Sequence, residues 1–354
     1  MKTVFCTKIG DLRDPDESKR ARVEVLDVDE KQIVNDETVK IKTAYCAICG
    51  SDPHDIGGIF GHPPPIGMGH EVSGVVVEVG KKAVKKGLKP GDRVAGNFLR
   101  PCGTCFYCRN KQEQFCEYQG EFICPGMSEY IVWHEAQLYK LPDDVSLKEG
   151  CLLEPVSVAT RAADKTRVKA GDKVAVCGGG PIGLLTLQIM NMYGATSLTL
   201  IEPIKARREL AKGFGALHTI DPVSGDQVKE AMEITGGAGF DVVIEASGAP
   251  SAAASMPFIT ARGGTIVFAA MYPNDYEIPI NMFTHFYRNE ITMTGMILSP
   301  YTFPRSVALL PRLDLKPFVQ KYFYIDDCTE AFLTHLSGEY PKILMLCNKD
   351  LENL

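Results

Sequence analysis

The chain has 354 residues, of which 45% are hydrophobic and 23% are charged, and its formal net charge is -6 at pH 7. That length is too great for one ordinary hydrophobic core, so we expect two domains. The acidic balance argues against a surface for nucleic acid or anionic membrane, no apolar run is long enough to span a bilayer, and no signal-peptide core follows Met1; we therefore expect a cytoplasmic protein.

The first part of the chain is rich in short strands. Residues 21–28 and 38–42 alternate apolar with polar side chains, which is typical of an antiparallel sheet with one exposed face. Residues 72–80 form a further β-rich run that ends at glycine, and residues 89–94 indicate a turn that leads into another strand. This density of short strands and turns predicts a compact, β-rich, barrel-like first domain.

A candidate metal site lies within this domain. Cys49, His70 and Glu71 supply a thiolate, an imidazole and a carboxylate, which are the ligand types of a zinc site that keeps one position open. Ser51 and His54 follow Cys49 closely and offer a hydroxyl and a second imidazole, groups suited to moving a proton. The segment therefore predicts a catalytic metal with a proton carrier beside it.

Cys46 gives the same segment a second interpretation, because Cys46 and Cys49 form a C-x-x-C pair. Such pairs occur as redox-active disulfides, but the residues that follow Cys49 favour a metal. The chain has 12 cysteines in all. Without a secretion signal, the scattered ones are expected to be ordinary free thiols.

Four further cysteines are clustered at metal-ligand spacing. Cys102, Cys105, Cys108 and Cys116 follow the pattern C-x2-C-x2-C-x7-C, and four thiolates can enclose one zinc ion with no position left for a substrate. An iron–sulfur cluster is the alternative, since it too is held by four thiolates. The surrounding sequence favours zinc, so we expect a closed site that stabilises a loop and does no chemistry.

A second domain is indicated by an apolar strand over residues 174–177, which runs into a glycine-rich turn and then an apolar helix over residues 184–190. Strand, G-x-G-x-x-G turn and helix together are the fingerprint of a dinucleotide-binding fold. The glycines of such a turn allow tight turning, close approach of the backbone to the pyrophosphate, and close packing of helix on strand. The candidate cofactor-binding residues are Gly178, Gly180, Pro181, Ile182 and Gly183.

The next strand, residues 197–201, ends at Glu202. A carboxylate at this place accepts hydrogen bonds from the ribose hydroxyls of NAD and repels the 2′-phosphate of NADP. Arg207 lies close in sequence and could instead bind that phosphate, so we expect NAD and leave NADP open. Apolar strands at 241–245 and 264–268, separated by a helix-compatible stretch, predict a doubly wound parallel sheet.

In this order, the motifs resemble those of the zinc-dependent medium-chain dehydrogenase family, especially its polyol, sorbitol, butanediol and threonine dehydrogenase branch. The resemblance covers nearly the whole chain. It implies an α/β protein in which a GroES-like, β-rich catalytic domain carries a doubly wound Rossmann cofactor domain. The implied boundaries are 1–155 for the catalytic domain, with the structural zinc lobe at about 95–120, then 156–292 for the cofactor domain and 293–354 for the return to the catalytic domain.

The resemblance rests on Cys49 to Asp52 with His54, Gly69 to Glu71, the four-cysteine lobe, Leu153-Glu154-Pro155, and the fingerprint that ends at Glu202 and Arg207. It implies that Cys49, His70 and Glu71 are ligands of a catalytic zinc. Glu154 then matches a second carboxylate that can exchange with Glu71 on the metal. Our hypothesis takes Glu71 as the resting ligand and Glu154 as its exchange partner.

The same resemblance implies the activity. The chain would transfer a hydride between a secondary alcohol and NAD, with zinc acting on the alcohol as a Lewis acid. Ser51 and His54 resemble the proton relay of the family, and Asp52 a support behind the metal ligands. The substrate would be a polyol, a sugar alcohol with or without a phosphate, or a diol; a threonine-type amino alcohol dehydrogenase is the alternative. The implied cofactors are NAD and two zinc ions per chain, one catalytic and one structural, and the implied assembly is a homodimer or homotetramer.

The chain departs from the sorbitol dehydrogenases in one loop. Those enzymes are expected to carry an Arg-Tyr pair that contacts the polyol near the position of Leu298 and Ser299. Sorbitol itself is therefore not the expected substrate. By family register, Phe60, Phe122 and Leu298 are candidate walls of the substrate pocket.

Two further interpretations compete with this one. The four-cysteine lobe could be a zinc-ribbon module that binds nucleic acid or protein, but no cluster of basic residues flanks Cys102 to Cys116. A zinc-free reductase of the same fold, as in the quinone oxidoreductases, would lack the set of Cys49, His70 and Glu71. Metal content separates these cases, because the zinc-dependent dehydrogenase would hold two zinc ions per chain and a merely structural lobe would hold one.

Overall fold

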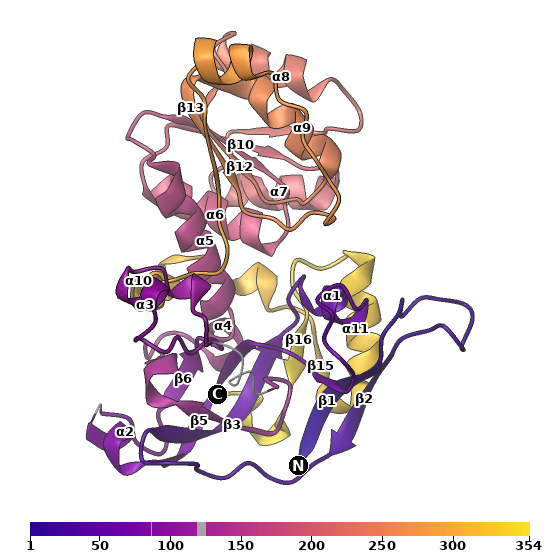
Figure 1. The fold of residues 1–354 in the computed structure, drawn as a ribbon, viewed down its shortest axis with the longest axis vertical. Helices are drawn as coiled ribbons and strands as arrows, with labels where there is room; N and C mark the ends of the chain where they lie inside the picture. The colour runs from indigo at the N-terminus through magenta and orange to yellow at the C-terminus, as the bar shows by residue number, and fades with distance from the viewer. Residues whose placement is uncertain (86, 119–124) are drawn as a thin grey trace. The chain divides into compact units, whose positions relative to one another are not determined.

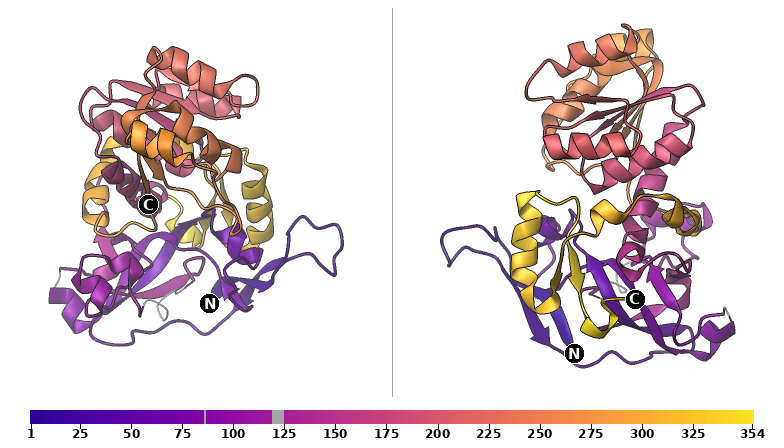
Figure 2. Two further views of the ribbon diagram at one scale, coloured as in Figure 1. Left: turned by 45° about the horizontal axis from the view of Figure 1, so that its top comes forward. Right: turned by 180° about the vertical axis from the view of Figure 1, so that it is seen from behind.

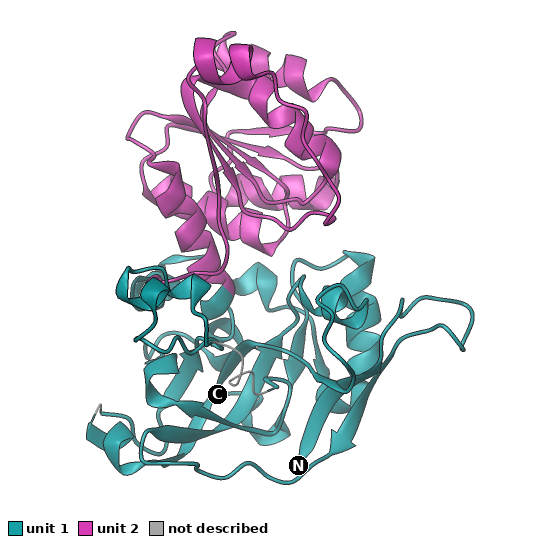
Figure 3. Cartoon of the chain, in the orientation of Figure 1, with its two compact units in different colours: residues 1–154, 303–354 teal, residues 155–302 magenta. Residues whose placement is uncertain are grey.

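The computed structural model describes residues 1–85, 87–118 and 125–354 (Figures 1 and 2). These residues form two compact units, which Figure 3 shows in different colours. Unit 1 comprises Met1–Glu154 and Phe303–Leu354, and unit 2 comprises Pro155–Thr302. Phe122, one of the predicted pocket walls, lies outside the described residues. No helix in the described part of the chain combines the length and the apolar character that crossing a bilayer requires.

Unit 1 is built on two sheets. The three-stranded sheet has the order β2-β1-β4, and the seven-stranded sheet has the order β15-β16-β3-β5-β6-β8, with β7 paired to β3. The β-rich first domain that the sequence predicts is confirmed, and strands β15 and β16 from the C-terminal segment complete its larger sheet. The strands are β1 (Lys2–Lys8), β2 (Arg22–Asp27), β3 (Thr38–Ala47), β4 (Ile66–Gly67), β5 (Glu71–Val79), β6 (Arg93–Gly96), β7 (Tyr130–His134), β8 (Leu138–Lys140), β15 (Tyr322–Tyr324) and β16 (Leu344–Leu346).

Apolar side chains of the strands and of one C-terminal helix form the core of unit 1. Val39 and Ile41 of β3 lie in one buried cluster with Val72 and Val76 of β5, because alternate residues of a strand point to the same face of the sheet. Phe332 of α11 joins this cluster. The helices are α1 (Asp52–Ile56), α2 (Lys81–Lys85), α3 (Phe106–Arg109), α4 (Leu147–Gly150), α10 (Phe303–Leu309) and α11 (Cys328–Ser337), while α5 (Leu153–Thr166) runs on into unit 2.

Unit 2 is one six-stranded sheet with helices on both faces (Figure 2). The strand order is β11-β10-β9-β12-β13-β14, and every pairing is parallel. This is the order of a doubly wound dinucleotide-binding fold, so the predicted Rossmann sheet is confirmed. The strands are β9 (Lys173–Cys177), β10 (Ser197–Ile201), β11 (His218–Ile220), β12 (Phe240–Glu245), β13 (Thr260–Phe268) and β14 (Thr292–Gly295), and the helices are α6 (Pro181–Met192), α7 (Lys205–Gly213), α8 (Gln227–Thr235) and α9 (Pro250–Ile259).

The chain re-enters unit 1 later than the sequence suggests. Residues 293–302, which the sequence analysis assigns to the returning catalytic segment, belong to unit 2. Met293 and Gly295 in β14 pair with Ile266 and Phe268 of β13, which extends the parallel sheet by one edge strand. The strand is short and half-exposed, so it lacks the continuous apolar run that marks the inner strands of a parallel sheet.

Candidate functional site

Three neighbouring strands of the larger sheet in unit 1 end or begin at one place. Ala47, the last residue of β3, pairs with Glu71 at the start of β5 and with Leu344 at the start of β16. The pairing continues beyond β3, since the Ile48 amide donates to the Ile343 carbonyl. Side chains that flank these strand ends therefore meet at one end of the three neighbouring strands. They are Cys49, His70, Glu71 and Lys342.

Cys49, His70 and Glu71 form a group that fits a metal ion. One ligand atom from each of the three lies within 4.8 Å of the others. The Glu71 side chain is 1% exposed, and its Oε2 atom has no hydrogen-bond partner among the described residues. A buried carboxylate oxygen without a donor is costly unless a cation contacts it. The donor set and this oxygen together fit the predicted catalytic zinc.

Asp52 contacts two of these three residues, Cys49 and His70. One carboxylate oxygen accepts a hydrogen bond from the Cys49 amide at 2.8 Å, and the other lies 3.7 Å from Nδ1 of His70. Burial raises the pKa of Asp52 to about 6. The 3.7 Å contact at Nδ1 is longer than a hydrogen bond, but it places a carboxylate on the side of the ring away from Nε2, which leaves Nε2 of His70 for a metal.

Lys342 forms a buried ion pair with Glu71. Its Nζ atom lies 2.6 Å from Oε1 of Glu71, and the two side chains are 3% and 1% exposed. Burial alone would lower the pKa of Lys342, but the charges of Glu71 and Cys49 raise it above the ordinary lysine value. Lys342 therefore stays charged, and it holds one Glu71 oxygen while the other remains unpartnered within the described chain.

Sequence reasoning missed Lys342, which lies 271 positions from Glu71. No local motif connects two residues so far apart. The available signal is a lysine placed directly before the apolar run of β16, because a strand that is buried along its length tends to bury its flanking residues too.

Glu154 lies nearby but outside the group of three. It is 5% exposed, in the first turn of α5, and burial raises its pKa to about 7, with the Glu71 carboxylate adding to the rise. Burial alone would lower the pKa of His70, but Cys49, Asp52 and Glu154 raise it well above the ordinary histidine value. Several acidic groups therefore lie close to His70.

Ser51 and His54 both lie at the short helix α1 next to Cys49. Ser51 precedes the first residue of α1, and the ring of His54 has its centroid 6.2 Å from that of Phe60. Both side chains are partly exposed. Neither makes a side-chain hydrogen bond to another described residue, so each is available to a substrate or to solvent. The proton relay stays a prediction.

Cys46 is a different kind of thiol from Cys49. Both are free cysteines, but Cys46 is completely buried and burial raises its pKa well above the ordinary cysteine value. Because the thiolate is the reactive form, this environment disfavours disulfide exchange at Cys46.

The four lobe cysteines also converge. One Sγ atom from each of Cys102, Cys105, Cys108 and Cys116 lies within 4.8 Å of the others. The Cys102 sulfur accepts hydrogen bonds from the amides of Thr104 and Cys105 at 3.4 and 3.3 Å. Hydrogen bonds from Thr104 lower the pKa of Cys102 to about 6. Sulfur atoms that gather in this way and accept amide hydrogen bonds could hold a structural zinc.

A cavity of about 600 Å³ in unit 2 contains most of the predicted cofactor residues. Pro181 and Ile182 instead form the first turn of α6 outside its lining. Gly183 packs α6 on β9 so closely that a Cβ there would lie 1.8 Å from the carbonyl oxygen of Gly178. The predicted residues that line the cavity are Gly178, Gly180, Glu202 and Arg207.

Glu202 joins the glycine turn to the end of β10. It is 3% exposed, and its two oxygens accept hydrogen bonds from the amides of Gly179 at 2.5 Å and Ile204 at 2.8 Å. The neighbouring Arg208 is engaged with Asp221 at 3.0 Å. The negative charge of Glu202 therefore stands at the wall where the fold places an adenosine ribose.

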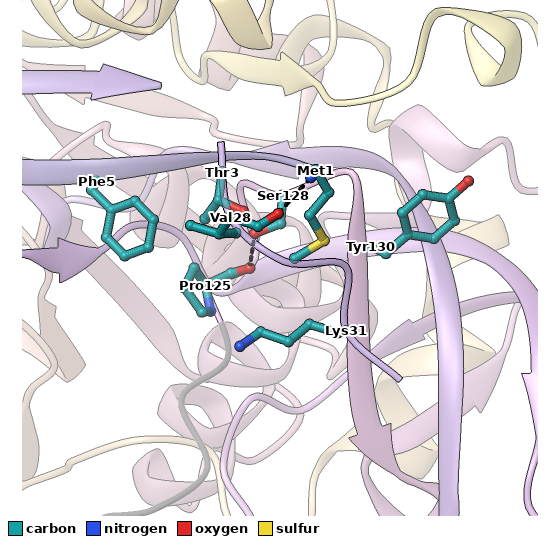
Figure 4. Close-up of a pocket in the computed structure, with 8 residues that line it drawn as sticks. All are labelled: Met1, Thr3, Phe5, Val28, Lys31, Pro125, Ser128 and Tyr130. Carbon is teal, nitrogen blue, oxygen red and sulfur yellow. Dashed lines mark hydrogen bonds between the residues drawn. The ribbon is translucent and has the colours of Figure 1, made fainter. Parts of the chain in front are cut away.

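A smaller cavity of about 70 Å³ lies in unit 1 (Figure 4). In it the Ser128 hydroxyl donates to the Pro125 carbonyl at 2.7 Å. Its lining contains none of the predicted site residues, and its volume is that of about two water molecules. We exclude it as the substrate site.

Two protein-family profiles match separate parts of the chain. The family profile described as alcohol dehydrogenase GroES-like domain matches residues 35–143, and the profile described as zinc-binding dehydrogenase matches residues 181–312. The first match contains Cys49, His70 and Glu71 and the cysteine lobe. The second begins at the helix that follows the glycine turn.

Individual relatives act on different alcohols. The chain is 34% identical over 330 residues to D-arabitol-phosphate dehydrogenase of Enterococcus avium, covering 89% of this chain and 91% of that protein. It is 33% identical over 329 residues to sorbitol dehydrogenase of Rattus norvegicus, covering 89% and 90%. The solved structure of 2R,3R-butanediol dehydrogenase from Bacillus subtilis has a TM-score of 0.83 at 30% identity, covering 98% and 99%. Such similar identities do not select one substrate.

The Lys342–Glu71 pair leads to a prediction about stability. In the presence of a chelator, Lys342→Met should lower the free energy of unfolding of unit 1 by about 3–5 kcal/mol, because it leaves a buried carboxylate without its cation. Trp133 is the single tryptophan of the chain and is buried in unit 1, so its fluorescence in a denaturant titration reports this transition.

The matched control is Lys82→Met. Lys82 also pairs with a glutamate, Glu37, at 2.9 Å, but the two side chains are 61% and 37% exposed. Solvent screens such a pair, so its loss should change the Trp133 transition little. Equal, small effects of the two substitutions would contradict the importance given to the buried pair.

Proposed function

Because the chain belongs to the zinc-dependent medium-chain alcohol dehydrogenase family, whose members are oxidoreductases that use NAD or NADP, we propose that it transfers a hydride between a secondary alcohol and NAD. The proposed substrates are polyols, sugar alcohols with or without a phosphate, and diols. The observation that most supports this proposal is the convergence of Cys49, His70 and Glu71 on one point, with a buried Glu71 oxygen that lacks a partner among the described residues.

We infer that these three residues hold the catalytic zinc, with Glu71 as the resting carboxylate ligand. Glu71 is favoured over Glu154 because its carboxylate belongs to the group that contains the thiol and the imidazole. Glu154 remains close enough to influence His70, which suits a carboxylate that replaces Glu71 during turnover. The four lobe cysteines would hold a second, structural zinc.

Zinc at this site would supply Lewis-acid polarisation of the substrate hydroxyl. The residues of the chain then have three tasks. Asp52 and Lys342 hold His70 and Glu71 in place. Ser51 and His54, which are partly exposed, carry the hydroxyl proton to solvent.

NAD would supply the hydride acceptor. The glycine turn at Gly178 to Gly183 leaves room for the pyrophosphate at the start of α6, where backbone amides favour an anion. Glu202 would accept hydrogen bonds from the ribose hydroxyls, since each of its oxygens keeps a lone pair beyond the backbone amide that it already binds.

The loop around Leu298 supports a substrate other than sorbitol. Ser299 is 6% exposed, and its hydroxyl accepts a hydrogen bond from that of Ser157 at 2.7 Å. Ser299 is therefore committed within unit 2 and does not offer the polar contact that an Arg-Tyr pair would give a polyol. Leu298 adds only an apolar side chain at this place.

A substrate panel tests the proposed reaction. Diols, sugar alcohols, phosphorylated polyols and threonine are offered in turn with NAD and with NADP, and nicotinamide reduction is followed by absorbance. We expect activity with a polyol or a diol and NAD, with NADP about ten-fold or more less efficient because Glu202 repels its 2′-phosphate. Preference for NADP would show that Glu202 is misassigned, and activity with threonine alone would show that the substrate class is wrong.

Metal content tests the two zinc sites. The purified protein should contain about two zinc ions per chain, and Cys49→Ser should contain about one and lose its activity, because only the open site is disrupted. Cys328→Ser is the control, since Cys328 is a thiol of unit 1 with no predicted ligand role, and it should keep both ions. About one zinc in the unaltered protein, together with full activity in Cys49→Ser, would contradict the mechanism.

We also infer a homo-oligomer, a dimer or a tetramer. Met282, Phe283 and Tyr287 are 64%, 64% and 79% exposed, and they precede β14, the last strand of the parallel sheet. An exposed apolar surface beside an open sheet edge favours association.

Light scattering after size-exclusion chromatography tests this inference. The unaltered protein should have a multiple of the 38.8 kDa chain mass, and Phe283→Glu combined with Tyr287→Glu should shift it toward the monomer. The control is Leu217→Glu, which places one glutamate at a 67% exposed apolar residue beside the opposite sheet edge. A monomeric unaltered protein, or equal dissociation by the control, would contradict this assignment.

A further inference from the structure

A buried carboxylate stands at the point where the strand order of unit 2 reverses. Glu245 is the last residue of β12, is 0% exposed, and is paired in register with Cys177, the last residue of β9. Strand β9 lies between β10 and β12, so the chain order changes direction at this pair. In open α/β sheets, ligands bind outside the carboxyl ends of the strands at such a point.

Four hydrogen bonds from described residues converge on this carboxylate. It accepts hydrogen bonds from the amides of Ser247 at 2.8 Å and Gly248 at 3.3 Å, and from the hydroxyls of Ser247 and Tyr272. Burial, together with the hydrogen bond to Glu245, raises the pKa of Tyr272, which keeps its hydroxyl a donor. Two amides and two hydroxyls on the same carboxylate hold its side chain in one orientation. None of the ion pairs between described residues involves Glu245, so no cation compensates its charge.

The turn that Glu245 holds is a wall of the dinucleotide cavity. Ala246, Ser247 and Ala249 line this cavity together with Gly178 and other residues of the glycine turn. The two turns touch, since a Cβ on Gly178 would lie 2.7 Å from the amide nitrogen of Ser247. Glu245 therefore sets the position of the wall that faces the glycine turn.

The charge of Glu245 lies on the side of the cavity opposite Glu202. If Glu202 on β10 binds the adenosine ribose, the other half of the dinucleotide crosses β9 toward β12. The nicotinamide ring in that half is cationic when oxidised and neutral when reduced. A fixed anion in a region of low dielectric stabilises a nearby cation more than a neutral ring.

We propose that Glu245 is a positioning residue that holds the 246–248 turn and, through its uncompensated charge, favours the oxidised nicotinamide over the reduced one. The inference rests on the proposed use of a nicotinamide dinucleotide. It adds a residue that biases the bound cofactor toward NAD⁺, the form that accepts a hydride from an alcohol.

Binding measurements on the zinc-loaded protein without alcohol test this proposal. NADH binding is followed by its fluorescence and NAD⁺ binding by competition, which gives the ratio of the two dissociation constants. Glu245→Gln removes the charge and should raise the ratio of the NAD⁺ constant to the NADH constant about five-fold or more. Glu209→Gln, which neutralises an exposed carboxylate of α7 paired with Lys212, should leave the ratio unchanged.

Tyr272→Phe separates the two effects proposed for Glu245, which are the position of the 246–248 turn and the carboxylate charge. It removes one donor and keeps the carboxylate, so both dissociation constants should rise while their ratio stays the same or falls. A ratio that rises in Tyr272→Phe would overturn the proposal even if Glu245→Gln failed to fold. Equal weakening of both ligands in Glu245→Gln would also overturn it and leave only a structural role. Failure of the unaltered protein to bind either dinucleotide would instead contradict the proposed function itself.

Discussion

Lys342 and Glu71 form a buried ion pair at the strand ends of the larger sheet of unit 1. The pairing of β3 with β5 and β16 brings them together, and no local segment could do so. The lysine binds one carboxylate oxygen of Glu71, next to Cys49 and His70. The other oxygen then lacks a partner among the described residues. A buried carboxylate oxygen without a partner is costly, and a divalent cation on this oxygen would supply the missing contact.

The candidate sites of the two units share one feature, a buried carboxylate at the ends of neighbouring strands. In unit 1 the candidate metal ligands flank the ends of β3 and β5, with Lys342 before β16, and in unit 2 the candidate cofactor-binding residues and Glu245 lie at the carboxyl ends of β9, β10 and β12. At each place a nearly inaccessible carboxylate organises the backbone or the ligands: Glu71 with Lys342, Glu202 with the glycine turn, and Glu245 with its own turn. The strands fix these carboxylates, so little of the site depends on mobile loops.

Local motifs could be predicted from the sequence because their chemistry and spacing are visible in one short segment. The cysteine lobe and the glycine turn are of this kind, and the ligand atoms of Cys49, His70 and Glu71 do converge. Lys342 and Glu245 could not be predicted, since their roles come from strand pairing and from turns that meet across the sheet. The edge strand β14 was hidden for a related reason: half-exposed and short, it carries no pattern that separates it from the chain that follows.

The ligand set of the catalytic metal is the central claim, and an anomalous difference map from crystals of the zinc-loaded protein, measured at the zinc absorption edge, tests it most directly. The account predicts one peak among the four lobe sulfurs and a second bonded to Cys49 Sγ, His70 Nε2 and Glu71 Oε2, with Lys342 still on Oε1. A second peak held by Glu154 in place of Glu71 in the resting enzyme, or the absence of any peak beside Cys49, would contradict it.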